Sequence, residues 1–216
     1  MPTTTPTGSA AGPGAATAAI KGTGARESQR LQTRARIFDA AVAEIGRRGL
    51  AGADVAAIVT AAGVARGTFY FHFPTKEHVL VELEHVEETQ MVARLQAKVG
   101  KSTDLRSVLT MVVRQVLAAE RKLGPVVFRD MLALHFSPTR PVEDELGGHP
   151  LAEFVIAAIT RAQHAGRVSR DAEPGELGVI FLTGLFALLA TAGGSRARSA
   201  LLDRYVTTIV QGMEAS

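Results

Sequence analysis

Apolar residues recur with the period of an α-helix along most of the chain from Arg26 onward. In the first such stretch, Ile37, Ala41 and Ile45 follow one another at intervals of four, and Asp39 falls on the opposite side. This spacing predicts an amphipathic helix with one buried face.

The same spacing predicts a series of further helices. Gly49 is expected to end the first helix, and a short helix begins after Asp54 and runs to a tight turn at residues 62–64. The remaining helices are expected at residues 65–71, 76–99, 104–122, 125–136, 150–165, 174–191 and 197–213. No stretch shows the alternating, β-branched pattern of a strand over more than a few residues. We therefore expect an all-α fold.

The first 25 residues differ in composition from the rest of the chain. Twenty-one of them are Ala, Gly, Thr or Pro, which leaves too little apolar side chain to offset the entropy lost on ordering. We expect residues 1–25 to form a disordered tail. Residues 26–75 then form a three-helix domain and residues 76–216 a larger helical domain, with residues 76–99 as the helix that links the two.

Composition argues against several kinds of chemistry. The chain has 216 residues and no cysteine, which removes disulfides, Cys-ligated zinc, iron–sulfur clusters and thiol catalysis together. No Ser-His-Asp order, glycine-rich phosphate loop or dinucleotide fingerprint is present, so we expect neither an enzyme nor a cofactor. His78, Glu82 and His85 have a spacing that can gather a metal ion. Because that spacing is common on solvated helices, we expect no metal site.

The sequence has no feature that predicts export or membrane insertion. Its start lacks the basic residues and the continuous apolar run of a signal peptide. The longest apolar stretch, residues 179–192, is shorter than the ~18–20 residues of a membrane span. We expect this stretch to be a buried helix in a cytoplasmic protein that has no membrane partner.

Basic residues are concentrated near the start of the chain. Residues 1–80 hold nine Lys and Arg against five Asp and Glu, whereas the rest holds fifteen against sixteen. A basic N-terminal module favours a nucleic-acid partner. Lys21, Arg26, Arg30 and Arg34 add charge that either forms a basic arm along DNA or belongs to a solvated tail.

Two short helices joined by a glycine-containing turn, after a supporting helix, form the pattern of a helix-turn-helix. The turn and the residues after it read Ala62-Gly63-Val64-x-Arg66-Gly67-Thr68-Phe69-Tyr70-x-His72-Phe73-x-x-Lys76-Glu77. This run resembles the DNA-binding signature of the tetracycline-repressor (TetR) family, and the close resemblance covers about residues 30–80. It implies a dimeric, ligand-responsive transcriptional regulator, usually a repressor, whose partner is double-stranded operator DNA.

A recognition helix has to be thin where it enters the major groove, and it has to offer hydrogen-bond donors there. Arg66 can bind guanine or a phosphate, and Lys76 can hold a phosphate at the start of the next helix. The resemblance also implies that Tyr70 and His72 contact phosphate oxygens. The expected DNA-binding residues are Arg66, Gly67, Thr68, Tyr70, His72 and Lys76.

One departure from the family pattern leaves a second hypothesis open. The family often has Ser or Thr at the position of Ala65, where the side chain caps the recognition helix. Loss of such a cap costs about 0.5–2 kcal/mol of local stability. The alternative is therefore an all-α dimeric small-molecule-binding protein without specific DNA readout.

The last two predicted helices each carry a wide apolar stripe, which suits a four-helix interface between two copies of the chain. Alternatively, both stripes face the core of their own subunit. The expected interface residues are Leu177, Ile180, Phe181, Gly184, Leu185, Leu188, Leu202, Tyr205, Val206 and Ile209.

Polar residues interrupt the apolar faces of the helices predicted at 104–122, 125–136 and 150–165. A few polar groups among apolar side chains are what a small-molecule pocket requires, and a small hydrophobic or amphipathic effector is expected there. Core packing or surface pairing is the alternative for each residue. The expected ligand-binding residues are Met111, Arg114, Gln115, Phe128, Met131, Leu132, His135 and Phe154.

Overall fold

The computed structural model describes residues 14–100, 103–141, 148–191 and 196–214. These residues form helices and no strand, apart from one isolated bridge between Val168 and Glu214. The helices are α1 (Gly14–Gly52), α2 (Val55–Ala62), α3 (Arg66–His72), α4 (Lys76–Gln96), α5 (Leu105–Leu123), α6 (Pro125–His135), α7 (Pro150–His164), α8 (Pro174–Thr191) and α9 (Arg196–Met213). The expected all-α fold is confirmed.

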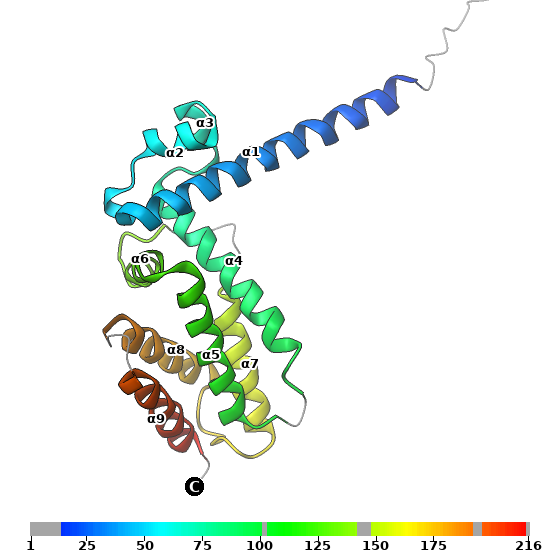
Figure 1. Cartoon of the computed structure of the whole chain (residues 1–216). Helices are drawn as coiled ribbons and strands as arrows, with labels where there is room; N and C mark the ends of the chain where they lie inside the picture. The colour runs from blue at the N-terminus through cyan, green and yellow to red at the C-terminus, as the bar shows by residue number, and fades with distance from the viewer. Residues whose placement is uncertain (1–13, 101–102, 142–147, 192–195, 215–216) are drawn as a thin grey trace, which may run out of the picture.

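The first three helices form a small unit (Figure 1), and its core also contains residues of α4 and α6. Asp54 caps α2 by accepting a hydrogen bond from the backbone N–H of Ala56 at 2.9 Å. Gly63 ends the helix in the left-handed conformation, at φ 64°, where a side chain would be strained. This turn places α3 so that Phe69 and Phe73 are buried with Ile58 and the C-terminal half of α1.

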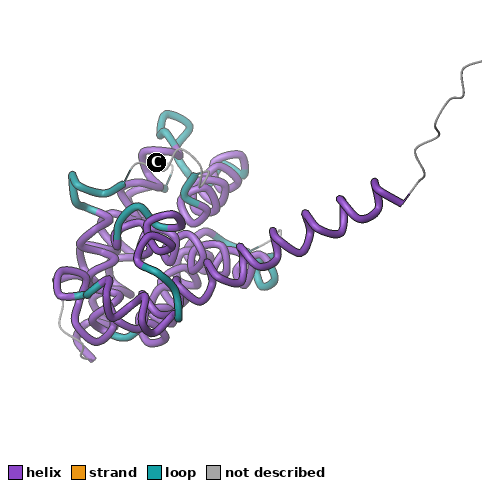
Figure 2. The backbone as a smooth tube through the Cα atoms, turned by 90° about the horizontal axis from the view of Figure 1, so that it is seen from above, coloured by secondary structure: helices purple, strands orange, loops and turns teal. Residues whose placement is uncertain are grey.

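Helix α1 begins inside the segment for which we expected a disordered tail. It starts at Gly14, and its N-terminal half projects away from the rest of the chain (Figures 1 and 2). Alanine, which has the highest helix propensity, is frequent between residues 14 and 25, and this favours helix there without any packing. Residues 1–13 of the expected tail lie outside the described residues. At Gly49 the helical geometry is interrupted, as the sequence predicts, with φ 72°.

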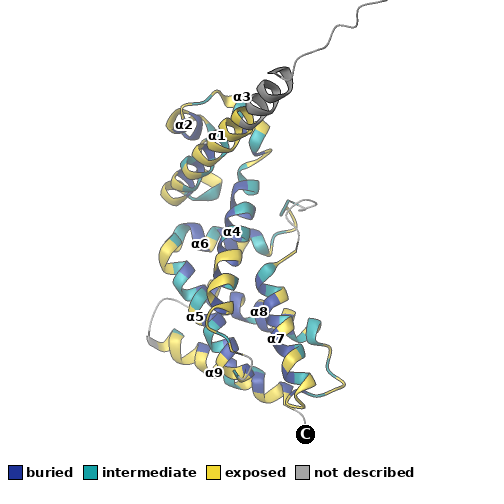
Figure 3. Cartoon of the chain, turned by 90° about the vertical axis from the view of Figure 1, so that its right-hand side faces the viewer, coloured by how far each residue is buried: buried dark blue, intermediate teal, exposed yellow. Residues whose placement is uncertain are grey.

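Helix α4 connects the N-terminal unit with the larger helical unit. Its first turns pack on the N-terminal core through Val79, Leu80 and Leu83, and its later turns pack on the second core through Met91 and Leu95. The second core is formed by α5 and α7, with α8 and α9 on its outer side (Figures 1 and 3). One continuous helix therefore contacts both units.

Helix α8 has the length and apolar character of a membrane span, with a mean hydropathy of 1.6 over 18 residues. It is the one such helix among the residues that the structure describes. One of its faces packs in the second core through Phe181, Leu185 and Leu189, beside α7 and α9. The opposite face, with Val179 and Ile180, is exposed.

Several residues expected at a dimer interface lie instead in the core of their own subunit. Phe181, Leu185, Leu202 and Val206 are at most 3% exposed, so for these four the prediction is corrected and the stripes face inward. Their helices pack on α5 and α7, which bury the widest part of each stripe. Leu177, Leu188, Tyr205 and Ile209 are half-buried against the same core, and Ile180 alone of the ten is largely exposed.

Gly184 permits a close approach, but within the chain rather than between copies. A Cβ atom at Gly184 would lie 2.3 Å from the hydroxyl of Tyr205. That hydroxyl donates a hydrogen bond of 2.8 Å to the backbone oxygen of Phe181. Because Gly184 has no side chain, Tyr205 of α9 can approach α8 closely enough to form this hydrogen bond.

Candidate nucleic-acid interface and effector groove

Helix α3 is held by one face and presents the other to solvent. Phe69 and Phe73 are buried, with ring centroids 6.1 Å apart, and Phe38 of α1 packs beside Phe73 at 6.3 Å. These two phenylalanines of the motif therefore belong to the core. Their burial fixes the orientation of the helix and therefore the direction of every other side chain on it.

Arg66 and Tyr70 lie together on the exposed surface of α3. The guanidinium carbon of Arg66 is 5.9 Å from the centre of the Tyr70 ring. Tyr70 in turn rests edge-on against the buried Phe69, with centroids 5.3 Å apart. The contact leaves the guanidinium donors and the phenolic hydroxyl accessible, and both suit contacts to DNA.

Gly67 has no packing reason to lack a side chain. A Cβ atom placed there would meet nothing within 4 Å. Because an interior helical glycine costs ~1 kcal/mol relative to alanine, open space above it points to close approach by another molecule.

Thr68 and His72 are half-buried on the flank of α3. Burial lowers the pKa of His72, and the positive charges of Arg34 and Arg30 lower it further. The imidazole is therefore neutral near pH 7, so it offers a hydrogen bond to a phosphate rather than a positive charge.

Lys76 does not point a free ammonium group toward DNA. Its Nζ donates to the backbone oxygens of Leu50 at 2.9 Å and Ala53 at 2.8 Å, with a longer contact of 3.5 Å to Ala51. The three donors of the ammonium are thus directed at carbonyl groups at the end of α1 and just beyond it. The expectation that Lys76 holds a phosphate is corrected: it ties α4 to α1.

Arg34 also has a structural role. Its guanidinium stacks over the ring of Phe73 at 4.5 Å and pairs with Glu82 of α4. It therefore adds nothing to a free basic arm. Arg30 is exposed but pairs with Glu27 at 2.7 Å.

Ala65 leaves the recognition helix without a side-chain cap, as the sequence predicts. Only its backbone oxygen contributes, by accepting the N–H of Thr68 at 3.0 Å.

Phe71 is a surface residue that sequence reasoning missed. It is 73% exposed and lies one turn after Gly67, on the side opposite Phe69 and Phe73. Its spacing from those two core residues was the available signal, since residues two apart in a helix point in very different directions.

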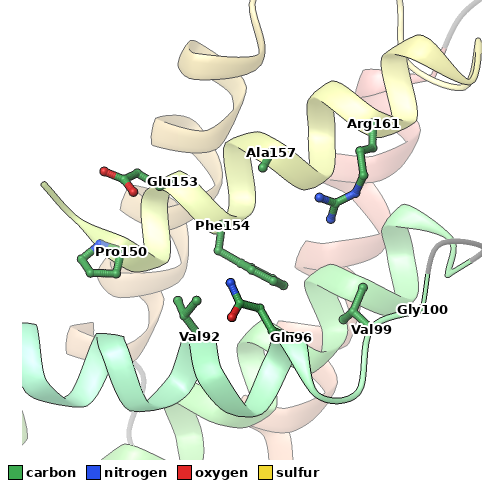
Figure 4. Close-up of a pocket in the computed structure, with 9 residues that line it drawn as sticks. All are labelled: Val92, Gln96, Val99, Gly100, Pro150, Glu153, Phe154, Ala157 and Arg161. Atoms are coloured by element: carbon green, nitrogen blue, oxygen red, sulfur yellow. The ribbon is translucent and has the colours of Figure 1, made fainter.

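A groove of about 440 Å³ lies between the C-terminal half of α4 and α7 (Figure 4). Val92, Val99 and Phe154 give it apolar walls, while Gln96 and Arg161 bring polar atoms from the two helices. Its volume is within the range of pockets that hold small ligands. Of the eight expected ligand-binding residues, only Phe154 lines it.

The other expected ligand-binding residues lie elsewhere. A narrow, enclosed cavity with an acidic lining is surrounded by the buried residues Phe128, Met131 and Leu132. The sequence did not predict this acidic lining. Met111 and Gln115 are half-buried, Arg114 is exposed, and none of the three lines the groove or this cavity.

Three glutamates of α4 line the enclosed cavity and connect helices. Glu84 accepts from Nδ1 of His135 at 2.7 Å and pairs with Arg140, and Glu87 pairs with Lys122 of α5 at 2.5 Å. His135, expected to bind a ligand, thus holds α6 to α4.

The three α4 residues with metal-ligand spacing do not converge. Glu82 pairs with Arg34, and Nδ1 of His78 lies 3.0 Å from the hydroxyl of Thr75. Among the described residues no group of three His, Asp or Glu side chains is arranged to hold a metal ion.

The geometry of the N-terminal unit agrees with a comparison against protein families. Residues 37–83, from the middle of α1 into α4, match the model of the bacterial regulatory proteins of the tetR family. Residues 37–83 therefore resemble this family. This is a family of regulatory proteins, and the match covers the core of the domain that positions α3.

Curated proteins similar to this chain include the fatty acid metabolism regulator protein of Bacillus subtilis (strain 168). It is 27% identical over 116 residues, which make up 52% of this chain and 60% of that protein. The alignment therefore spans less than two thirds of the relative's length.

Solved structures share the whole fold. FadR of Thermus thermophilus, in complex with lauroyl-CoA, has a TM-score of 0.66 and 23% identity, over 85% of this chain and 96% of that one. RolR in complex with resorcinol also has a TM-score of 0.66, at 18% identity, over 87% and 90% of the two chains. At such identities the likeness establishes the fold.

Proposed function

We propose that the protein is a transcriptional repressor that binds a palindromic operator as a homodimer and is released by a small hydrophobic or amphipathic molecule. The observation that carries the proposal is the exposed face of α3, where Arg66, Gly67 and Tyr70 project from a helix fixed by two buried phenylalanines. A protein with this role acts in the cytoplasm, where the operator lies.

The exposed face of α8 supplies the dimer contact in this proposal. Val179 and Ile180 are 58% and 54% exposed, and Leu201 of α9 is 39% exposed. Small exposed residues such as Thr183 and Ala187 lie beside them and allow close helix approach. A two-fold axis through this face would set two copies of α3 about 34–36 Å apart, in successive major grooves.

The groove between α4 and α7 is the proposed effector site. Its apolar walls suit an apolar body, and Arg161 suits a polar or anionic end. Complexes with lauroyl-CoA and with resorcinol are recorded for proteins of this fold, which supports an effector of either amphipathic or small aromatic character.

Helix α4 is the proposed route by which the effector acts. It begins just after α3 and its C-terminal half forms one wall of the groove. A ligand that prefers a wider spacing of the two recognition helices lowers DNA affinity by the ratio of its affinities for the two states.

The test is fluorescence anisotropy on duplexes selected by the full-length protein from a random-sequence pool, against a scrambled duplex, at two salt concentrations. Preference that survives the higher salt is expected. Arg66→Ala should weaken binding about 5- to 100-fold and relax specificity at one base pair. Arg121→Ala, an exposed change on α5, is the matched control.

Equal binding to selected and scrambled duplexes, lost as salt rises, would overturn the proposal. It would favour the alternative, an all-α dimeric small-molecule-binding protein without specific DNA readout. The feature of the structure that supports this second candidate is the missing side-chain cap of α3 at Ala65.

A further inference from the structure

The part of α3 farthest from the core carries a single side chain, and it is apolar. Phe71 has the largest exposed fraction of the large hydrophobic residues that the structure describes. At 3.6 residues per turn, Phe71 and Gly67 point away from the core, on the side opposite Phe69 and Phe73. Because Gly67 has no side chain, Phe71 alone projects from this outermost face.

The polar residues of α3 occupy its two flanks. Arg66 and Tyr70 lie on one side of the outermost face, and Thr68 and His72 on the other. When such a helix enters a major groove, its outermost face meets the base edges and its flanks reach the two phosphate backbones. This arrangement directs Phe71 at the bases.

The chemistry of Phe71 selects what it can read there. A phenyl ring neither donates nor accepts a hydrogen bond, so it gains nothing from the polar edges of the bases. The one apolar group that a base pair presents in the major groove is the C5-methyl of thymine. Contact between the two removes apolar surface from water on both sides.

The helix that carries Phe71 is held in place before DNA binds, because Phe69 and Phe73 are buried. The Phe71 ring itself has one ring neighbour, the imidazole of His72, with centroids 5.0 Å apart. Ordering of the backbone therefore adds no entropy cost when the contact forms.

From this geometry we infer that Phe71 is a specificity-determining residue that reads the methyl group of a thymine in each operator half-site. The inference rests on the proposed DNA-binding function and adds the base that is recognised. Packing of Phe71 against the sugar-phosphate backbone is the competing arrangement, and it would carry no sequence preference.

The experiment removes the methyl group without changing base pairing. In a duplex selected by the full-length protein, each thymine is replaced in turn by deoxyuridine, and affinity is measured by fluorescence anisotropy. The wild type should bind about 4-fold more weakly when one particular thymine in a half-site is replaced, the value of one buried methyl group. The Phe71→Ala variant should bind the selected duplex and this deoxyuridine duplex equally. It should remain sensitive to changes at the other positions that the protein contacts.

Phe136→Ala serves as the matched control, since it removes another exposed phenylalanine, 49% exposed and outside α3. It should keep the full response to deoxyuridine. If no deoxyuridine weakens the wild type, or if Phe71→Ala weakens binding to every duplex alike, the inference is wrong while the DNA-binding function stands. Failure to select any preferred duplex would overturn both.

Discussion

The ammonium of Lys76 lies 2.8 Å from the backbone oxygen of Ala53 and 2.9 Å from that of Leu50. The first residue of α4 is thereby bonded to the C-terminal end of α1 and the segment that follows it. Carbonyl groups at a helix end have no partner within the helix and carry partial negative charge. The link holds the helix-turn-helix unit in a fixed relation to the helix that leads to the effector groove.

Lys76→Met should therefore lower the free energy of unfolding of the protein. It should leave the number of its ionic contacts with DNA unchanged. We expect the free energy of unfolding in urea to fall by about 2 kcal/mol, as for hydrogen bonds to a charged group. The salt dependence of DNA binding should keep its slope, whereas loss of a phosphate contact would reduce it by about one.

Lys98→Met is the control for this prediction, because Lys98 is exposed. It should leave the urea midpoint unchanged. A Lys76→Met variant of wild-type stability with a reduced salt slope would restore Lys76 as a phosphate contact.

Glu88 should make stability depend on pH. Burial raises the pKa of Glu88 to about 7, and the nearby carboxylate of Glu84 adds to this, while the N–H of Leu151 and the side chains of His135 and Arg140 act in the opposite direction. The folded protein then binds a proton that the unfolded chain releases near pH 4.5. Stability should fall as pH rises from about 4.5 to 7, by up to about 3 kcal/mol.

Glu88→Gln should remove that part of the pH dependence and raise stability at pH 8 relative to the wild type. Urea unfolding at pH 5 and pH 8 measures it, with the exposed Glu153→Gln as control. The comparison between variants isolates the contribution of Glu88 from that of every other titrating group in the chain. An unchanged difference between the two pH values would show that Glu88 is ionised throughout.

Gly184 and Tyr205 should be energetically coupled. A methyl group at Gly184 would collide with the Tyr205 ring, whose nearest carbon is 2.8 Å away. Gly184→Ala should lower the free energy of unfolding by about 1–3 kcal/mol. In a Tyr205→Ala background the same change should cost clearly less, and a double-mutant cycle measures the difference. If the effects of Gly184→Ala and Tyr205→Ala on the free energy of unfolding simply add, α8 and α9 can move apart to accept the methyl group without strain.

The exposed face of α8 should govern the oligomeric state. Ile180→Glu places a carboxylate on the surface that we propose meets its own copy across a two-fold axis, so we expect a monomer in light scattering and weaker operator binding. Leu31→Glu, on the projecting part of α1, is the control because Leu31 is similarly exposed, at 53%. A persistent Ile180→Glu dimer would place the interface elsewhere.

Local features of the chain could be predicted from the sequence by itself. Helix periodicity, the cap at Asp54, the turn at Gly63 and the missing cap at Ala65 each depend on neighbours within a few residues. The motif at residues 62–77 likewise carried the resemblance to the tetR family and the residues that α3 exposes at Arg66, Gly67 and Tyr70. These are short-range properties, and a linear pattern contains them.

Only the tertiary structure decided what each side chain meets. Lys76 binds carbonyls more than twenty residues earlier in the chain, and His135 binds a carboxylate of α4. The stripes of α8 and α9 face inward because α5 and α7 cover them, and apolar periodicity is the same whether a face meets its own core or a second copy. The groove between α4 and α7 is formed by residues far apart in sequence, and no local spacing encodes such a distance.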